Sequence, residues 1–456
     1  MTTAHHDVIV VGGGIAGLTC AYQLKLAGVD AVVLEAQSTP GGNTQSQSSG
    51  GFVYEYGPHT FPASAEAIFS LVNQLGLDSD IMQTAQAGRV RFVVRHSQVH
   101  KVPSSLWALF TTRLISWRAK FAMIAEPLRR GQVNPSDTVH SFFSRRIGEE
   151  AATVFGGAFV NGVYAGDAHK LSARSAFPLL WSFEQGAGSL IIGAWRHFRK
   201  LKRDRAESNK PPRKGLFSFK GGIGRLTVAL ASALNDRFVS NKRVDSLEFS
   251  DGLWLATSGE STYSAKQVVL AVPPNCASSL LENVSPVVAG QLQQIPMAPI
   301  AVVHLGYRDR QPALPDGFGL LVAPKESTYS LGILFPSRLF SDRAPANGEL
   351  ISAFVGGVGN PVAIDLPDAA LTERVKGDLD HLFGLRCDPE VVQVLRYKSA
   401  IPQFTDGHAS RIATISKGLA DNPGLHLAGN YLTGVGLKDA VHSGLAASKA
   451  CMESTG

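Results

Sequence analysis

The sequence predicts an α/β fold in which a Rossmann-like dinucleotide-binding domain is assembled from both ends of the chain. A glycine-rich turn follows a short apolar run at residues 7–11 and precedes a helical pattern. A second glycine-rich segment, 428–441, lies near the other end of the chain and also follows an apolar run. Parallel sheets of this class bind nucleotides at the carboxyl ends of their strands, so both segments are predicted to meet one cofactor.

The first motif has the spacing of a dinucleotide-binding turn. Its residues are Gly12, Gly13, Gly14, Ile15, Ala16 and Gly17. In such a turn the glycines permit the tight bend, the approach of a pyrophosphate to the backbone, and close packing of helix on strand. The N-terminus of a helix predicted over 18–27 would face the phosphates. Glu35, at the end of the apolar run 30–34, is placed to accept hydrogen bonds from a ribose diol. NAD and FAD fit these residues equally well.

Two further pieces favour FAD over NAD. Gly41 and Gly42 follow Glu35 closely, where glycines let the chain pass near another part of an extended dinucleotide. Near the other end, a strand is predicted over 425–428, and a helix is predicted from Val435 onwards. The positive N-terminal end of that helix would stabilise an anionic reduced flavin. Three such pieces in one chain predict FAD as the cofactor.

Composition is that of a large enzyme without disulfides or metal. The 456 residues suffice for two or three domains, each with its own core. The four cysteines are far apart, with neither a CxxC pair nor a cluster of metal-binding residues, which indicates a reducing compartment. The chain runs directly into its first strand, and its longest stretch without Asp, Glu, Lys or Arg, 283–307, contains three prolines. We therefore expect a cytoplasmic protein.

The interior pattern predicts three domains. Residues 1–85, 215–275 and 405–456 form the predicted FAD-binding domain, because they carry the glycine motifs and buried strands. Strand-like runs over 297–356 predict a mixed sheet, which with its flanking residues gives a substrate-binding domain of 86–102 and 276–404. Residues 103–214 are predicted to be mainly helical.

The helical domain carries a membrane hypothesis. Aromatic and basic residues alternate over 104–130, as in helices that lie on a bilayer, although packing against neighbouring helices explains them equally well. Residues 196–214 hold nine Lys and Arg against two acidic residues, a net charge of +7 (9 − 2). This basic run is either a solvated loop or a segment that contacts anionic lipid at the inner face of the membrane. Nucleic acid is not expected as a partner, because no binding module accompanies it.

Several sequence blocks resemble the protoporphyrinogen oxidase family, within the monoamine oxidase and phytoene desaturase group of flavoproteins. The blocks lie at 57–61 (GPHTF), 159–167, 181–185, 339–345, 354–357, 400–404 and 428–441. The likeness runs almost end to end and is similar to the oxygen-dependent type of plastids and many bacteria. It implies non-covalent FAD, oxidation of protoporphyrinogen IX by O2, release of H2O2, and a tetrapyrrole substrate. Family members often form homodimers and associate peripherally with membranes.

The resemblance also implies site residues. Arg91 matches the arginine that pairs with a substrate propionate, and a guanidinium fork suits that carboxylate. Leu321, Leu334 and Phe354 match apolar residues that hold the pyrrole rings in the family. Gly162 matches a glycine where the backbone approaches the tetrapyrrole. For FAD the match adds Gly57, Pro58, His59, Thr60, Val244 on a strand of the flavin sheet, Val435, Gly436 and Leu437. No acid–base side chain is nominated, because hydride transfer to flavin N5 depends mainly on orientation.

The chain departs from the plastid pattern at two places. His59 stands where plastid-type relatives usually have Asn, and the closing helix reads GVGLKDAVHSG rather than a GVALGRCVEGA-like run. Three alternatives stay open: oxidation of coproporphyrinogen III to coproporphyrin III, an amine oxidase or carotenoid desaturase on the same fold, and a porphyrin-binding flavoprotein without catalysis. The closing flavin segment has no cysteine before Cys451, which argues against a covalent flavin.

Overall fold

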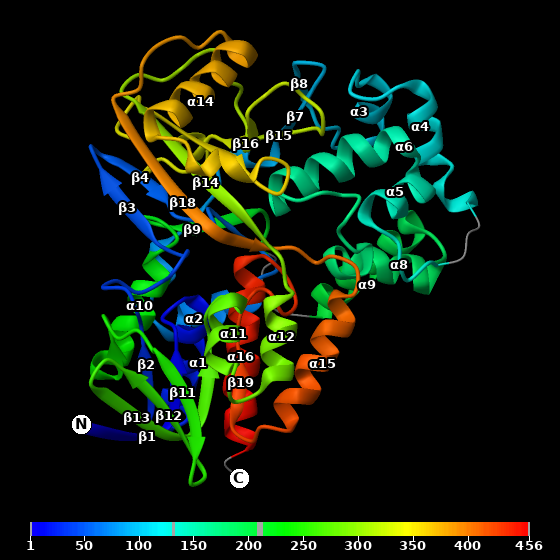
Figure 1. Cartoon of the computed structure of the whole chain (residues 1–456). Coiled ribbons are helices and arrows are strands. Elements are labelled where there is room, and N and C mark those ends of the chain that lie inside the picture. Colours follow the sequence, from blue (N-terminus) through cyan, green and yellow to red (C-terminus); the bar gives the residue numbers. More distant parts are fainter. Residues whose placement is uncertain (1, 130–132, 208–212, 455–456) are drawn as a thin grey trace.

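The computed structural model describes residues 2–129, 133–207 and 213–454 (Figure 1). Arg130 of the aromatic and basic stretch and residues 208–212 of the basic run lie outside the described residues. The described chain has a mixed α/β fold with two large sheets, as expected, and a separate group of helices lies to one side of the second sheet.

The first sheet brings together strands from the two chain ends and the middle. Its order is β10 (Phe238–Val239), β2 (Ala31–Leu34), β1 (Thr2–Val11), β13 (Ser261–Leu270), β12 (Leu253–Ser258) and β11 (Ser246–Ser250), with β19 (Leu425–Leu427) also beside β13. Pairings among β10, β2, β1, β13 and β19 are parallel, whereas β11 and β12 run antiparallel. The carboxyl ends of the five parallel strands therefore share one edge.

Helices cover both faces of this sheet. Val8 and Val10 of β1 face α1 (Ile15–Leu26), α10 (Arg225–Leu234) and α16 (Leu437–Glu453), together with α2 (Glu66–Gln74). Ile9 and Val11 point the other way, toward α11 (Pro274–Leu281), α12 (Pro286–Gln293) and α15 (His408–Ala420). Burial on both faces explains why the central segments of this sheet, residues 8–11 of β1 and 31–34 of β2, are continuous apolar runs.

The packing of α11 and α12 bears on the predicted domain boundary at residue 275. Ala277, Leu281, Val288 and Leu292 share a core with β1 and β13 and not with the second sheet. Residues 276–293 thus lie with the first sheet, because their apolar faces are buried on it. The division into domains stays a prediction, and this packing would move its boundary to about residue 296.

The second sheet has seven strands and one helix-covered face. Its order is β18 (Val391–Pro402), β14 (Met297–Tyr307), β17 (Glu349–Gly356), β16 (Ser330–Leu334), β15 (Gly319–Val322), β7 (Arg91–Arg95) and β8 (Gln98–Lys101). Pairing is antiparallel except between β15 and β7. One face packs on α14 (Asp368–Phe383). Smaller sheets, β3 (Ser46–Ser49) with β4 (Phe52–Glu55), and β5 (Phe61–Pro62) with β9 (Leu216–Phe219) and β6 (Ile81–Gln83), complete the body.

Residues 103–207, hereafter the helical region, are mainly helical, as predicted. They form α3 (Leu106–Thr111), α4 (Trp117–Ile124), α5 (Val139–Ile147), α6 (Glu149–Ala151), α7 (Ala173–Ala176), α8 (Pro178–Ala187) and α9 (Leu190–Glu207). Two π-helical segments, Ala152–Gly157 and Val160–Tyr164, lie between α6 and α7.

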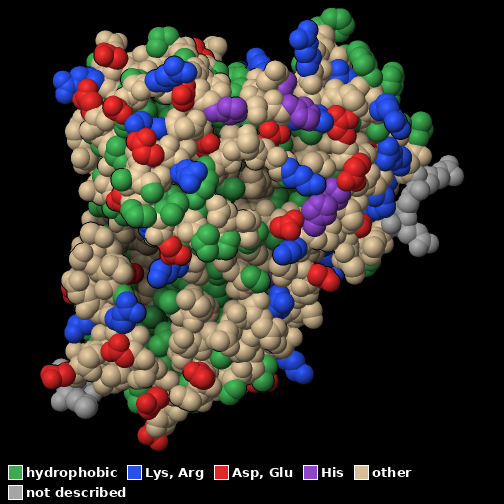
Figure 2. All heavy atoms as spheres, turned by 45° about the horizontal axis from the view of Figure 1, so that its top comes forward, with side chains coloured by type: hydrophobic (Ala, Val, Ile, Leu, Met, Phe, Trp, Pro, Cys, Tyr) green, Lys and Arg blue, Asp and Glu red, His purple; other side chains and the backbone are tan. Residues whose placement is uncertain are grey.

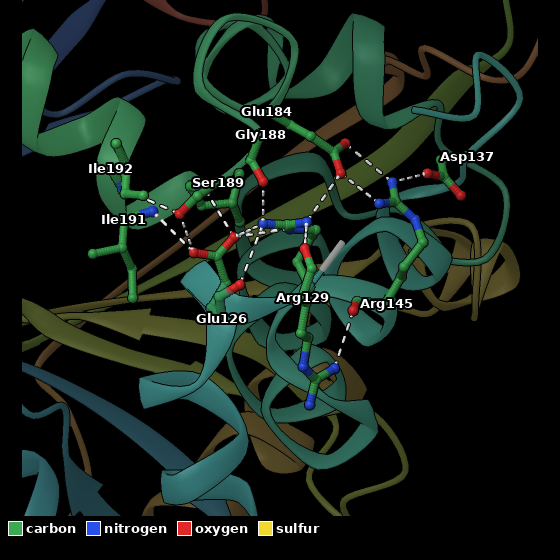
Figure 3. A network of polar contacts seen from close by, with 11 residues as sticks. Glu126, Arg129, Asp137, Arg145, Glu184, Gly188, Ser189, Ile191 and Ile192 are labelled. Carbon is green, nitrogen blue, oxygen red and sulfur yellow. Dashed lines mark hydrogen bonds and ion pairs between the residues drawn. The ribbon is translucent and has the colours of Figure 1, made fainter. Parts of the chain in front are cut away.

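Ion pairs hold the helical region together from inside (Figure 3). The fully buried Glu126 pairs with Arg146, whose Nε lies 2.8 Å from Oε1. Glu126 also accepts the N–H of Leu190 at 2.8 Å, so it caps α9. Burial acts to raise the pKa of Glu126, but hydrogen bonds from Ser189, Leu190 and Arg146 outweigh it and leave the pKa below its ordinary value.

The surface of the helical region is unusually apolar. Trp107 and Phe121 are 77% and 63% exposed, and further exposed apolar side chains are Leu106, Trp117, Leu128, Trp195 and Phe198. Figure 2 shows hydrophobic side chains beside Lys and Arg at the margin where α3 and α4 lie. Within the described residues, every helix is too short or too polar to cross a membrane.

Candidate cofactor and substrate site

The carboxyl edge of the first sheet gathers the predicted cofactor residues. The N–H of Gly12 donates to Leu34 O at 2.9 Å, and Ala271 N–H donates to Val11 O at 2.8 Å. Ala428 N–H then donates to Leu270 O at 3.0 Å, which attaches the closing segment to the same edge. Turns that are far apart in sequence thus leave the sheet side by side, because their strands are parallel.

Each glycine of the first motif has a distinct steric role. Gly12 has φ +105°, and a Cβ on Gly17 would lie 2.1 Å from Gly12 O, so α1 packs on β1 only with glycine at these positions. A Cβ on Gly14, in contrast, would meet no atom within 4 Å. The backbone at Gly14 therefore faces open space.

The start of α1 suits an anionic ligand. Gly14 is its N-cap and provides no capping side chain, and the first turn contains no acidic residue. The positive end of the helix is therefore uncompensated by the protein, which fits a pyrophosphate group.

Glu35 is fixed next to this turn. Its carboxylate accepts the N–H of Gly13 at 2.6 Å and that of Gln37 at 2.7 Å. The two oxygens keep acceptor capacity for a ribose hydroxyl, since each can accept more than one hydrogen bond. The residues at this edge fit the adenosine diphosphate half of FAD.

The second glycine pair lies against the first motif. Gly41 N–H donates to Gly13 O at 2.8 Å, and Gly14 and Gly41 form a parallel bridge. A Cβ on Gly57 would lie 2.5 Å from Asn43 O, so the Gly57–Thr60 segment begins in close contact with the residue that follows Gly42. Both segments singled out in the sequence therefore adjoin the predicted dinucleotide site.

The closing segment ends in α16 beside α1. Helix α16 begins at Leu437 with Gly436 as N-cap, two residues later than predicted. A Cβ on Gly444 would lie 2.3 Å from Ala16 O, which shows how closely the two helices pack. Asp439 accepts the N–H of Gly436 at 3.0 Å. This carboxylate offsets part of the positive helix end that was predicted to face a reduced flavin.

The prediction of a strand at Val244 is wrong. Val244 lies in the irregular connection between β10 and β11, where it packs on the first sheet's core. The connection is held to the site by Lys242 N–H, which donates to Glu35 O at 2.8 Å. The chain leaves the extended pairing here because it must pass from β10, at one edge of the sheet, to β11 at the other.

Four of the five predicted substrate residues, all but Gly162, share one face of the second sheet. Leu321 pairs with Gly332, which pairs with Phe354, while Leu334 lies two residues from Gly332. Arg91, at the start of β7, joins this face because it pairs with Gly319 in parallel register. Residues with the same register position point to the same side of a sheet, here the side opposite α14.

This face is incompletely covered by protein. The three apolar candidates Leu321, Leu334 and Phe354 are half-buried, whereas Ile333 and Ala353 on the other face are fully buried. Ligand sites are lined mainly by apolar side chains, so this face can serve as the wall of one.

Gly162 and Arg91 differ in what surrounds them. Gly162 lies in a π-helical segment, and a Cβ there would come 2.3 Å from Leu321 Cδ2, so its absence makes room for Leu321. The exposed guanidinium of Arg91 lies 5.3 Å from the Phe318 ring. Among the described residues no carboxylate pairs with Arg91, whereas nearby Arg95 binds Glu150.

The structure adds a buried polar cluster that the sequence analysis missed. Arg343 and Glu55 pair at 3.3 Å, and His304 Nε2 lies 3.1 Å from Glu55 O. Burial raises the pKa of the Glu55 carboxyl to about 7 against the lowering effect of Arg343. No periodicity links these positions, because β4, β14 and the residues after α13 (Pro336–Leu339) meet only in the fold.

Known proteins are similar to this one over almost the whole chain. A model of flavin-containing amine oxidoreductases matches residues 15–452. The mitochondrial protoporphyrinogen oxidase of Nicotiana tabacum is 31% identical, covering 96% of this chain and 93% of its own length. The protoporphyrinogen oxidase of Homo sapiens is also 31% identical and covers 96% of both chains.

Solved structures show the same fold. An Exiguobacterium protein assigned provisionally as a protoporphyrinogen oxidase has a TM-score of 0.84 at 24% identity, over 99% of this chain and 100% of its own. Cyclohexylamine oxidase from Brevibacterium oxydans has a TM-score of 0.73 at 18% identity, over 99% of both chains. FAD is the cofactor that the matched family and the site geometry indicate. The chain belongs to the flavin-containing amine oxidoreductases and, within them, to the protoporphyrinogen oxidase family.

Proposed function

We propose that this chain oxidises protoporphyrinogen IX to protoporphyrin IX with FAD, using O2 and releasing H2O2. The observation that carries the proposal is the near-complete similarity to protoporphyrinogen oxidases of plants and mammals. The half-buried face of the second sheet supports the proposal, because the apolar rings of a tetrapyrrole need an apolar surface and its propionates need a cation beside that surface.

The proposed roles follow from the positions of the residues. The Rossmann-like first sheet, built from both chain ends, would hold FAD non-covalently through Gly14, Glu35 and the Gly436 turn. Leu321, Leu334 and Phe354 would contact the pyrrole rings, and Arg91 would pair with a propionate. When bound, FAD supplies the hydride acceptor. The protein orients the macrocycle and excludes water from it.

A turnover assay tests this function. The purified FAD-loaded protein should convert protoporphyrinogen IX to fluorescent porphyrin with about three peroxides per macrocycle, because the oxidation removes six electrons and each flavin cycle moves two. Coproporphyrinogen III serves as the competing substrate. Much faster turnover of coproporphyrinogen would overturn the substrate assignment, and oxidation of neither would overturn the function.

We further propose that the helical region contacts a membrane peripherally, from the cytoplasmic side. Trp107, Phe121 and Leu128 expose large apolar side chains, and α9 of the same region carries Arg199 and Lys200. Aromatic side chains beside cations suit the boundary between acyl chains and anionic headgroups. Formation of a homodimer stays a prediction from the family resemblance.

A further inference from the structure

Helix α15 begins with two basic side chains that have no partner within the protein. His408 is 4% exposed, and neither of its ring nitrogens makes a hydrogen bond. Arg411 lies three residues later, on the same side of the helix, and its buried Nη1 also lacks an acceptor. Leaving buried polar atoms unpaired costs free energy, so these atoms point to a ligand that would satisfy them.

The backbone at this helix end offers further donors. Gly407, the N-cap, has no side chain to cap the helix, and the first turn contains no acidic residue. The N–H groups of Ala409 and Ser410 have no acceptor among the described residues. The Arg411 guanidinium reaches back to the same place, because a Cβ on Gly407 would lie 3.9 Å from Nη2. A positive helix end and a guanidinium thus lie together, which favours an anion.

The start of α10 shows how the protein compensates a similar arrangement elsewhere. Helix α10 also follows a glycine N-cap, Gly224, without a capping side chain or an acidic residue in its first turn. Its Arg225 pairs with Asp80 at 2.8 Å. At α15 the preceding Asp406 accepts a backbone N–H at 2.9 Å, and no carboxylate of the described residues forms an ion pair with Arg411. The cation of α10 therefore has a counter-ion in the protein, and that of α15 does not.

The His408 imidazole narrows the choice of anion. Burial, with Arg411 acting in the same direction, lowers its pKa to about 4 against a raising effect of the Leu432 carbonyl. The ring is therefore neutral near neutral pH, with one nitrogen that donates and one that accepts. The Leu432 carbonyl can serve only the donating nitrogen, so the accepting nitrogen needs an O–H or N–H from the ligand. Hydrogenphosphate supplies an O–H together with charged oxygens for the guanidinium and the helix end.

The site lies where three parts of the chain meet. The Phe404 ring stacks on that of His408 at 4.3 Å between centroids, and Phe404 O accepts the N–H of Ser172 from the helical region at 2.7 Å. Leu432 belongs to the closing glycine-rich segment. The start of α1, where the FAD pyrophosphate is proposed to bind, is a different helix end.

We propose that the start of α15 binds one hydrogenphosphate ion. The Arg411 guanidinium and the two free N–H groups of the first turn donate to its oxygens. Its O–H donates to the accepting nitrogen of His408. The phosphate comes from the free ion rather than from a phosphate monoester, because a monoester loses its last proton near pH 6 and then has no O–H to donate. The site goes beyond the proposed oxidation and does not depend on it.

The principal test is calorimetric titration of the FAD-loaded protein with sodium phosphate at about pH 8, where a monoester is fully ionised, with ionic strength held constant by chloride. We expect saturable binding to one site. Arg411→Gln should weaken it by about tenfold or more, the effect of losing one charged hydrogen-bonded contact. His408→Phe keeps the stacking on Phe404 but removes the acceptor, and should also weaken binding. Arg225→Gln, the matched control at α10, should bind phosphate normally.

Sulfate and glycerol phosphate test the role of the O–H. Both carry charged oxygens of the same kind but no proton to donate at this pH, so each should bind about tenfold or more weakly than phosphate, since a buried acceptor would stay unpaired. Equal binding of sulfate would exclude the hydrogen bond to His408. Tighter binding of glycerol phosphate would identify an organic phosphate as the ligand, contrary to the proposal.

Thermal unfolding separates this role from a purely structural one. If His408 and Arg411 only stabilised α15, replacing either would lower the unfolding midpoint in phosphate-free buffer. We expect no such loss, because neither side chain has a partner there. Phosphate should raise the midpoint more in the unmodified protein than in Arg411→Gln, whose response measures the general effect of the salt.

Three outcomes overturn the proposal: no saturable phosphate binding by the FAD-loaded protein, equal affinity in Arg411→Gln, or sulfate bound as tightly as phosphate. A site that FAD itself fills would give the first of these. If the variants do not fold, the comparison of phosphate with sulfate in the unmodified protein decides. The titration needs no turnover, so failure of the proposed oxidation would leave its result unchanged.

Discussion

The helical region and the two-sheet body are organised in opposite ways. The sheets bury apolar side chains, such as Ile9 and Val303, and leave an apolar face half-open only beside the proposed ligands. The helical region buries the ion pair Glu126–Arg146 and exposes Trp107 and Phe121. Apolar side chains of the sheets therefore stabilise the fold or contact a ligand. In the helical region many of them remain exposed, where they can contact a membrane.

The largest expected effect comes from removing the buried carboxylate of the helical region. Glu126→Ala leaves Arg146 buried without its counter-ion and uncaps α9, so we expect a loss of about 3–5 kcal/mol in the free energy of unfolding of this region. Urea titration followed by hydrogen exchange measures it. The ion pair between the exposed Glu149 and the partly buried His140 in the same region offers the control Glu149→Ala, which should cost at most about 1 kcal/mol.

Acidification should also lower the free energy of unfolding of the helical region. The pKa of Glu126 is lowered in the folded protein, so its contribution to stability is complete above the ordinary carboxyl pKa and is lost as pH falls through the lowered value. If Glu126→Ala were as stable as the control, the helical region would not depend on a charged interior.

Next in size is the exposed apolar surface. The triple variant Trp107→Ser, Phe121→Ser and Leu128→Ser should reduce binding to vesicles of neutral and anionic phospholipid by at least about 100-fold, because each large apolar side chain contributes about 1.5–3 kcal/mol when buried. Sedimentation with vesicles measures this. Val287→Ser with Val362→Ser, exposed apolar positions of the sheet body, should leave vesicle binding unchanged. Equal binding by both variants would contradict the proposed membrane surface.

In the two-sheet body, we expect a substitution at the proposed site to change ligand binding rather than stability. Arg91→Ala removes one charged hydrogen-bonded contact and should weaken substrate binding by about 1.5–3 kcal/mol, seen as a raised KM with little change in stability. Arg89→Ala, an exposed neighbour, is the matched control. An unchanged KM for Arg91→Ala would remove Arg91 from the site.

The smallest effect expected is at Gly14. An added Cβ fits the protein without contact there, so Gly14→Ala should leave the stability of the apoprotein unchanged. We expect about tenfold weaker FAD binding, because the methyl group would occupy the place where backbone approaches the pyrophosphate. Flavin fluorescence gives the dissociation constant, and Gly290→Ala, equally open but distant, should bind FAD normally. Full affinity in Gly14→Ala would place the pyrophosphate elsewhere.

Sequence reasoning identified the features that depend on local spacing. The glycine turn, the strand before it and the acidic residue after it are one contiguous pattern, and the structure places them together. Val244 was placed on a strand by the family resemblance alone, because its neighbours Arg243 and Asp245 are charged and give no strand pattern. The Glu126–Arg146 pair and the His59–His304 contact were missed, since each joins residues whose separation follows no period.

The packing of α1 on α16 has a consequence for biosynthesis. One side of the proposed flavin pocket comes from the turn at residues 12–17, and another comes from residues 428–437, far away in the sequence. Contacts between such distant segments form late and slowly in folding. A nascent chain would therefore contain the glycine turn of residues 12–17 long before the residues that complete the pocket, so retention of FAD would report that synthesis had reached α16.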